Sequence, residues 1–335
     1  MRPLRDLLRP VVSASGRRAR QGLEIDVLLR RLDELERRIE SVDQHVEAVD
    51  HRVEAVDRHV EATDHHVERA RWPHGPVYAG NGTAIVATRW GAKLYVDCSD
   101  SVLAPWLLLD GLWETGVTTW FHQVVFPGAH VVDVGANIGY FTVLGAKLTG
   151  PTGRVVGFEA NPRLRPIAAR NLAANSMHGH AEVRHLAAWS EAAELVLHLR
   201  RHFTGNSSFA PFDPAFLHHL GDEASEQVRV PAAALDDELA DLGRVDVVKI
   251  DVEGAELRVM QGLRRTLAAN PGIRVLCEWS PDSVGAVGDD AADLVALFDD
   301  LGLVASVLQD DGTVAPPPAD GLLALPYGNL VLARP

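Results

Sequence analysis

The sequence predicts an α/β domain built on a doubly wound, mostly parallel sheet, preceded by an all-α coiled-coil rod. Two patterns lead to this prediction: a heptad run between residues 25 and 67, and a later alternation of short apolar strands with helical segments. They divide the chain into a basic N-terminal lead-in at 1–22, a coiled coil at 23–72 and an α/β domain at 73–335 with its core at 126–335. Each part has its own periodicity, so we expect each to fold around its own apolar seam or core.

The rod is predicted by apolar residues that recur at alternating steps of three and four. From Val42 onward the heptad repeats as VDQHVEA, VDHRVEA, VDRHVEA and TDHHVER. From Arg31 onward, basic residues or histidines precede the first seam position of each heptad, and acids follow the second, which favours a parallel homo-oligomer through residues 25–67. The number of chains stays open, and the alternative is a long solvated helix that lies on its own domain.

The lead-in is rich in arginine and loosely amphipathic. Its sequence MRPLRDLLRPVVSASGRRAR lacks the apolar core of a signal peptide, and the chain has no run of about 18 apolar residues. A disordered lead-in is favoured over contact of residues 1–20 with an anionic membrane surface. The only cysteines are Cys98 and Cys277, which suits reduced thiols, so we expect a cytoplasmic protein.

The α/β domain is expected to follow a segment rich in proline and glycine. TAIVATRW and AKLYVD predict a hairpin, and a helical stretch follows at about 102–125. Strands are then expected at 130–134, 154–158, 181–187, 194–199, 245–250 and 273–278, and helices at 139–148, 162–175, 254–268 and 289–301. The tail, with LVASVLQ and NLVLARP, predicts a final antiparallel pair.

The charge of the chain argues against nucleic acid as a partner. The formal net charge is -14 at pH 7, and nearly all of it belongs to residues 73–335. A domain this acidic repels a phosphate backbone.

Ligand-binding residues are expected where the parallel strands stop, because ligands of doubly wound sheets bind beyond the carboxyl ends of the strands. The first strong strand runs into DVGANIG, in which Gly135 and Gly139 permit a tight turn and close approach of a ligand. A nicotinamide fingerprint needs glycines at steps of two and three, whereas these lie four apart, so a dehydrogenase is disfavoured. The candidates for cofactor binding here are Asp133, Gly135, Ala136, Asn137 and Gly139.

The second strand ends in Glu159, about twenty residues after the glycine turn. An acid at that place can accept hydrogen bonds from both ribose hydroxyls of a nucleoside. A glycine turn with such an acid, and without a basic phosphate clamp, suits an adenosine cofactor that lacks a pyrophosphate, and S-adenosylmethionine fits. The alternative is that Asp133 and Glu159 only cap helices.

Several motifs together give a resemblance to a known family. DVGANIGYFT, GFEANP, VPAAALDDEL and VDVVKIDVEGAELRVMQG resemble the FkbM family of S-adenosylmethionine-dependent methyltransferases, over about residues 83–335. The resemblance implies a class I methyltransferase fold and methyl transfer to a hydroxyl oxygen of a sugar or other natural-product or glycan acceptor.

The resemblance also implies roles for individual residues. It places the glycine-turn candidates at the methionine side of the cofactor and Glu159 at its ribose. Asn161 and the segment 187–190 are implied near the ribose and adenine. Small apolar residues occupy 187 and 188, where the family usually has an Asn or Asp, so the adenine contacts are the least defined.

Transfer to an alcohol oxygen requires loss of the hydroxyl proton, and KIDVEGAE offers groups for it. Asp251 is the first candidate for general base or acceptor anchor, Glu253 is the second, and Lys249 is an electrostatic partner. The alternative is that Asp251 caps a helix and Lys249 forms a structural ion pair. Glu278 can join these acids, but the three lack a fixed metal-ligand spacing, so no metal is predicted.

Two interpretations follow for the whole chain. The first is an oligomeric O-methyltransferase that acts on a small-molecule or glycan acceptor. The second is a non-catalytic coiled-coil interaction scaffold with a degenerate methyltransferase domain. The intact DVGANIG turn and Glu159 favour the enzyme, because a pocket without a cofactor has no evident need for both.

Overall fold

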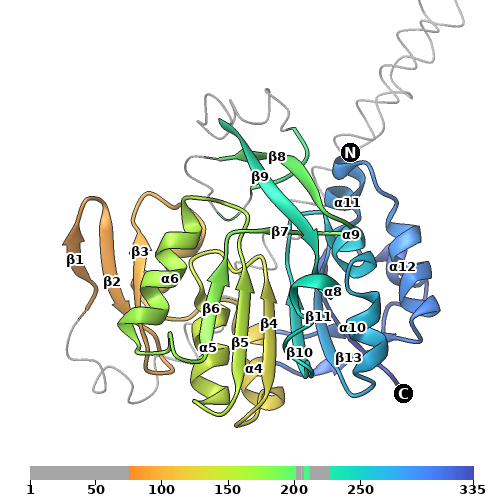
Figure 1. Ribbon diagram of the computed structural model, residues 1–335, viewed down its shortest axis with the longest axis horizontal. Coiled ribbons are helices and arrows are strands. Elements are labelled where there is room, and N and C mark those ends of the chain that lie inside the picture. The colour runs from red at the N-terminus through yellow and green to blue at the C-terminus, as the bar shows by residue number, and fades with distance from the viewer. Residues whose placement is uncertain (1–74, 201–204, 206, 212–225) are drawn as a thin grey trace, which may run out of the picture. The chain divides into compact units, whose positions relative to one another are not determined.

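An eight-stranded mixed sheet runs through the α/β part of the chain (Figure 1). The computed structural model describes residues 75–200, 205, 207–211 and 226–335. In spatial order the strands are β13 (Val314–Ala315), β12 (Val304–Leu308), β14 (Gly328–Ala333), β11 (Arg274–Trp279), β10 (Val247–Ile250), β4 (His130–Val134), β5 (Arg154–Phe158) and β6 (Ala181–Arg184). The five strands from β11 to β6 are parallel, whereas β14 pairs antiparallel with both β11 and β12. The predicted doubly wound sheet and its final antiparallel pair are therefore confirmed.

The chain divides into two units at Pro73. The predicted lead-in and coiled coil belong to the first unit and lie outside the described residues. The parallel oligomer through residues 25–67 therefore stays a prediction.

Helices cover both faces of the sheet because alternate strand residues point to opposite sides. Val131, Val155 and Val247 pack on the face covered by α3 (Leu103–Asp110), α4 (Thr115–Val124), α5 (Tyr140–Thr149) and α6 (Leu164–Ala174). The neighbouring residues Val132, Val156 and Val248 pack on the opposite face, covered by α8 (Leu235–Glu238), α9 (Glu256–Gln261), α10 (Arg264–Ala269), α11 (Pro281–Val287) and α12 (Ala291–Asp300). Both sides of the central strands are thus buried, which explains their continuous apolar sequences.

Two small sheets flank the large one (Figure 1). The predicted hairpin is confirmed as β2 (Thr83–Ala87) and β3 (Lys93–Asp97), with β1 (Val77–Gly80) added at the edge of β2. A second sheet has the order β7 (Ala187–Trp189), β9 (Glu226–Ala234), β8 (Ala193–Leu199), and Figure 1 shows it beyond the arrowheads of the parallel strands. A short 3-10 helix, η3 (Leu322–Ala324), precedes β14.

Several predicted boundaries were wrong, each for a local reason. The helix expected at about 102–125 is interrupted after Asp110, where Gly111 adopts φ 62° and donates back to Leu107 O. The helix expected at 254–268 is broken at Gly262, where a side chain would overlap the carbonyl oxygen of Trp189. β9 and α11 were not predicted; β9 contains Pro231 and fully buries only Val230 and Ala232.

No helix within the described ranges combines the length and apolar character needed to cross a membrane. Neither cysteine forms a disulfide. Cys98 is exposed, and Cys277 is buried, which raises the pKa of its thiol well above the ordinary value.

Candidate active site

A cavity of about 540 Å³ lies beyond the carboxyl ends of β4, β5, β10 and β11. This volume falls within the range of roughly 300–1,000 Å³ that is typical of small-molecule sites. Its walls come from the segments that directly follow these strands, from β7 and from the turn ahead of α4. Predicted site residues that line it are Gly135, Ala136, Asn137, Glu159, Lys249, Asp251 and Glu253.

The glycine turn is tied to Glu159 at one end of the cavity. The backbone N–H of Asn137 donates to Glu159 Oε2 at 2.6 Å, and that of Asn161 donates to Oε1 at 2.7 Å. Gly135 and Ala136 both donate their N–H groups to Phe158 O at 3.0 Å. Both carboxyl oxygens of Glu159 are thus oriented by the backbone, and each keeps a second lone pair for a ligand. Burial raises the pKa of Glu159 to about 7, although the two backbone hydrogen bonds oppose that effect.

Position 135 needs glycine for a second reason, besides the predicted close approach of a ligand. Its φ is 80°, and a Cβ there would overlap the carbonyl oxygen of Asp251. The glycine therefore brings the β4 turn against the loop after β10, in addition to lining the cavity.

Three predicted cofactor residues do not line the cavity. Asp133 is fully buried, and its Oδ2 accepts from Thr142 Oγ1 at 2.5 Å. Gly139, with φ 83°, begins α5 and lies where a Cβ would press on Ala168 of α6. Asn161 is 1% exposed, donates to Glu159, and bonds Ser207 Oγ through Nδ2 at 3.2 Å. Asn161 therefore orients Glu159 from outside the cavity lining, whereas Asp133 and Gly139 contact α5 and α6.

The adenine region implied by the resemblance is apolar. Ala187 and Ala188 of β7 line the cavity, and so do Leu186 and Phe209. An apolar slot of this kind suits a flat ring without providing polar contacts from side chains.

Lys249 and Asp251 form a partly buried ion pair at the end of β10. Lys249 Nζ lies 2.7 Å from Asp251 Oδ2, and the two side chains are 4% and 28% exposed. Lys249 also pairs in register with Asp133 on β4, and its Nζ lies 5.0 Å from the centre of the Phe141 ring. Burial by itself lowers the pKa of Lys249, but the surrounding carboxyls raise it above its ordinary value. Lys249 therefore remains an ammonium and is unsuited to act as a base.

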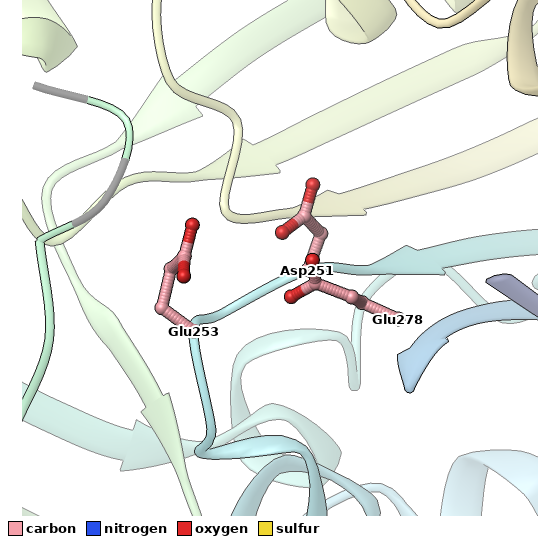
Figure 2. A group of neighbouring side chains, drawn as sticks. All are labelled: Asp251, Glu253 and Glu278. Atoms are coloured by element: carbon pink, nitrogen blue, oxygen red, sulfur yellow. The ribbon is translucent and has the colours of Figure 1, made fainter. Parts of the chain in front are cut away.

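A group of three acids lies beside this pair. Oxygens of Asp251, Glu253 and Glu278 come within 4.8 Å of one another, and Figure 2 shows the carboxyls of Asp251 and Glu278 next to each other with that of Glu253 directed into the same space. Burial, followed by the charges of Asp251 and Glu253, raises the pKa of Glu278 well above its ordinary value. Tyr327 donates its hydroxyl to Glu278 Oε1 at 3.1 Å. Three converging carboxylates suit a divalent cation as well as a polyol, so the expectation of no metal stays a prediction.

Sequence reasoning missed Glu114, which also lines the cavity. It lies in the turn ahead of α4, and its backbone has φ 42° and ψ 73°, a conformation that is rare for a residue with a side chain. Non-glycine residues with positive φ are few in the described ranges, and Glu114, Asn137 and Glu253 among them line this cavity. The signal available in the sequence was an acid placed between Trp113 and a helix, with no strand end beside it.

Comparisons of the sequence with known proteins identify a family. Residues 133–304 match a family model described as the methyltransferase FkbM domain. The chain is 30% identical over 155 residues to methyltransferase sdnD of Sordaria araneosa, covering 40% of this chain and 60% of that protein. It is 30% identical over 204 residues to the 31-O-demethyl-FK506 methyltransferase FkbM of Streptomyces tacrolimicus, covering 55% of this chain and 76% of that protein.

The chain spans 60% of the length of the first two curated relatives it matches. Among solved structures, an O-methyltransferase from Bacillus cereus in complex with SAH aligns with a TM-score of 0.37 and 15% identity, over 65% of this chain and 79% of that chain. That likeness is too distant to assign any residue a role.

Proposed function

The chain belongs to the FkbM methyltransferase domain family, and on that premise we propose that it transfers a methyl group to a hydroxyl oxygen of a sugar or other natural-product or glycan acceptor. The family uses S-adenosylmethionine, and the sheet has the doubly wound, mostly parallel form of a class I methyltransferase. One observation carries the proposal. A single cavity contains the glycine turn and Glu159 at the ends of β4 and β5, and carboxylates at the ends of β10 and β11.

The first end of the cavity suits the cofactor. S-adenosylmethionine supplies an electrophilic methyl group on a sulfonium. Glu159 accepts two backbone N–H bonds and is held ready to accept both ribose hydroxyls. Gly135, Ala136 and Asn137 form the adjoining wall, and Ala187 and Ala188 give the apolar surface for the adenine.

The other end suits an alcohol. A hydroxyl donates well to carboxylates, and it must lose its proton when the oxygen forms a bond to carbon. Asp251 is proposed as the acceptor anchor, the group that accepts a hydrogen bond from the substrate hydroxyl. It lines the cavity, and its Oδ2 accepts from the Lys249 ammonium at 2.7 Å. The ammonium fixes the orientation of that carboxylate, and correct placement of the hydroxyl contributes a large share of the rate. Glu253 is proposed as a second hydrogen-bond acceptor for the substrate.

The class of acceptor is supported by a relative. The name of the Streptomyces tacrolimicus protein describes methylation of an oxygen on 31-O-demethyl-FK506, a natural product. We extend only the class to this chain: an acceptor with hydroxyl groups, whether a sugar or another scaffold.

The heptad run is proposed to join several such domains through residues 25–67 as a parallel homo-oligomer. Light scattering on the full chain measures the mass directly. A change of the seam residue Val53→Asp should return the particle to the mass of one chain, and an unchanged mass would remove the coiled coil as the cause of assembly.

The cofactor site is tested by calorimetric titration of the full chain with S-adenosylmethionine, with NAD as the control ligand. We expect micromolar binding of the first, none of the second, and no binding to Glu159→Ala. Transfer is then measured with tritium-labelled cofactor and an acceptor panel of free monosaccharides and 31-O-demethyl-FK506, the compound in the name of the Streptomyces relative. A chain that binds no S-adenosylmethionine would instead support the scaffold interpretation.

A further inference from the structure

We propose that Glu114 is the general base that takes the proton from the acceptor hydroxyl, an inference that rests on the proposed function. Glu114 lines the same cavity as Asp251 and Glu253 but approaches it from a different element, the turn ahead of α4. The site then has two kinds of carboxylate. Asp251 anchors the acceptor, and Glu114 removes its proton.

The first reason is an oxygen that lacks a hydrogen bond. Glu114 Oε2 is buried, and no donor within the described part of the chain reaches it. A buried carboxyl oxygen without a partner is unfavourable, because the water it has lost is not replaced. A hydroxyl that enters the cavity can supply the missing hydrogen bond.

The second reason is the backbone that presents this side chain. Glu114 has φ 42°, although a non-glycine residue avoids that region unless its surroundings impose it. Its neighbours on both sides are fixed. The N–H of Thr118 donates to Glu114 O at 2.8 Å, and the Thr118 hydroxyl donates to Trp113 O at 2.7 Å. The N–H of Trp113 donates in turn to the hydroxyl of Tyr140 at 3.3 Å. The turn therefore fixes the backbone from which the Glu114 side chain reaches the cavity wall.

The third reason is electrostatic. Burial raises the pKa of Glu114 to about 7, and Lys249 is the nearby group that lowers it. A carboxyl with this pKa is about half ionised at pH 7, and its ionised form is basic enough to accept a proton there. Glu114 interacts electrostatically with six charged or titratable groups: Asp133, Tyr140, Lys249, Asp251, Glu278 and Tyr327.

Asp251 is less suited to the same task. Its Oδ2 is bonded to the Lys249 ammonium at 2.7 Å, and protonation of the carboxyl would weaken a partly buried ion pair. Glu114 gives up no such bond at Oε2 when it accepts a proton.

The acceptor oxygen forms a bond to the methyl carbon, the bond between that carbon and sulfur breaks with its electron pair left on sulfur, and the hydroxyl proton moves to the Glu114 carboxyl. Release of that proton to water returns Glu114 to its ionised form.

The test compares the full chain with Glu114→Gln, which keeps the size of the side chain but accepts no proton. Glu194→Gln is the matched control, because Glu194 lies on β8 with 62% of its side chain exposed and pairs with Arg229. Binding of S-adenosylhomocysteine is measured first by calorimetry, and we expect all three proteins to bind alike. Infrared spectra between pH 5 and 9 should show a carboxyl that titrates near pH 7 in the full chain and in Glu194→Gln, with its amplitude reduced in Glu114→Gln.

Methyl transfer to the acceptor panel is the second measurement. We expect Glu114→Gln to lose about 10²- to 10⁴-fold in kcat, the usual contribution of a general base, and Glu194→Gln to lose nothing. Chemical rescue of Glu114→Ala by formate would restore part of the rate. Transfer by Glu114→Gln within about threefold of the full chain would overturn the inference, as would an unchanged carboxyl titration. If the unsubstituted chain binds S-adenosylhomocysteine but transfers no methyl group to any acceptor, the proposed function fails, and this inference fails with it.

Discussion

Replacing Glu159 with glutamine is the sharpest test of how the chain holds its cofactor, because the substitution keeps the shape of the side chain. Each carboxyl oxygen accepts one backbone N–H, at 2.6 and 2.7 Å. Glutamine has one acceptor oxygen and one NH₂ group, so in either orientation its NH₂ faces a backbone N–H. One ribose hydroxyl of the cofactor also loses its charged acceptor, the Glu159 carboxylate.

The expected loss of cofactor affinity follows from the hydrogen bonds that Glu159→Gln removes. A hydrogen bond to a charged group contributes about 1.5–3 kcal/mol. Loss of one such bond to the ribose should weaken binding of S-adenosylhomocysteine by about 10- to 100-fold, since each factor of ten corresponds to about 1.4 kcal/mol. Glu159→Ala loses both bonds and should show no binding in the micromolar range.

The pH dependence of cofactor affinity provides an independent check on the role of Glu159. The pKa of Glu159 is raised to about 7, chiefly by burial, and the ribose hydroxyls bond the ionised form. Affinity in the full chain should therefore be level above about pH 7 and fall by up to about tenfold per pH unit below it. Glu159→Gln has no such group and should lose this dependence. Calorimetry at pH 5.5, 7 and 8.5 measures both effects, and binding by the glutamine variant within about threefold of the full chain at pH 8.5 would refute the role of Glu159.

Three further predictions concern other residues of the site. Asp251→Asn should bind S-adenosylhomocysteine normally and lose methyl transfer, and retained transfer would refute its role as anchor. Loss of the charge beside Lys249 should lower the free energy of unfolding by about 2 kcal/mol, measured in urea. Gly135→Ala should remove cofactor binding and destabilise the fold by about 3 kcal/mol or more, because the added Cβ overlaps the Asp251 carbonyl and the backbone φ is 80°. Normal cofactor binding by calorimetry would contradict the predicted overlap. For Glu114, the folded pKa of about 7 exceeds the ordinary value of 4.5, so its contribution to stability is present below pH 4.5 and lost as pH rises through about 7. Relative to the full chain, Glu114→Gln should therefore gain up to about 3 kcal/mol in free energy of unfolding between pH 4.5 and 8, and a difference independent of pH would refute the burial of this charge.

The sequence predicted the central strands well because these strands are buried on both faces. The strands expected at 130–134 and 154–158 have these same bounds in the structure, and those at 245–250 and 273–278 differ by at most two residues. Continuous apolar runs are sufficient for such strands. β9 was missed because it fully buries only Val230 and Ala232 and its position depends on pairing with β7 and β8.

The site was predictable only where a strand end supplied it. Glu159 and Asp251 directly follow β5 and β10, and the rule that ligands bind at strand ends identified both. Asp133 lies within β4, one residue before the strand ends, and is fully buried with its Oδ2 bonded to Thr142, so its role at the cofactor stays a prediction. Glu114 belongs to no strand, and only the packing of α4 beside α5 brings it to the cavity, which periodicity in the sequence does not reveal.

The distribution of strain bears on the choice between an enzyme and a scaffold. Asn137, Glu114 and Glu253 line one cavity, and all three have positive φ. Each such backbone costs on the order of 1–3 kcal/mol, the penalty being smaller for asparagine, and glycine would remove it. Glu114 adds a buried oxygen without a hydrogen bond. A protein whose methyltransferase domain served only as a scaffold would gain backbone stability from glycine at these three positions. Their presence together at one cavity is explained if a ligand contacts the side chains that the strained backbones present.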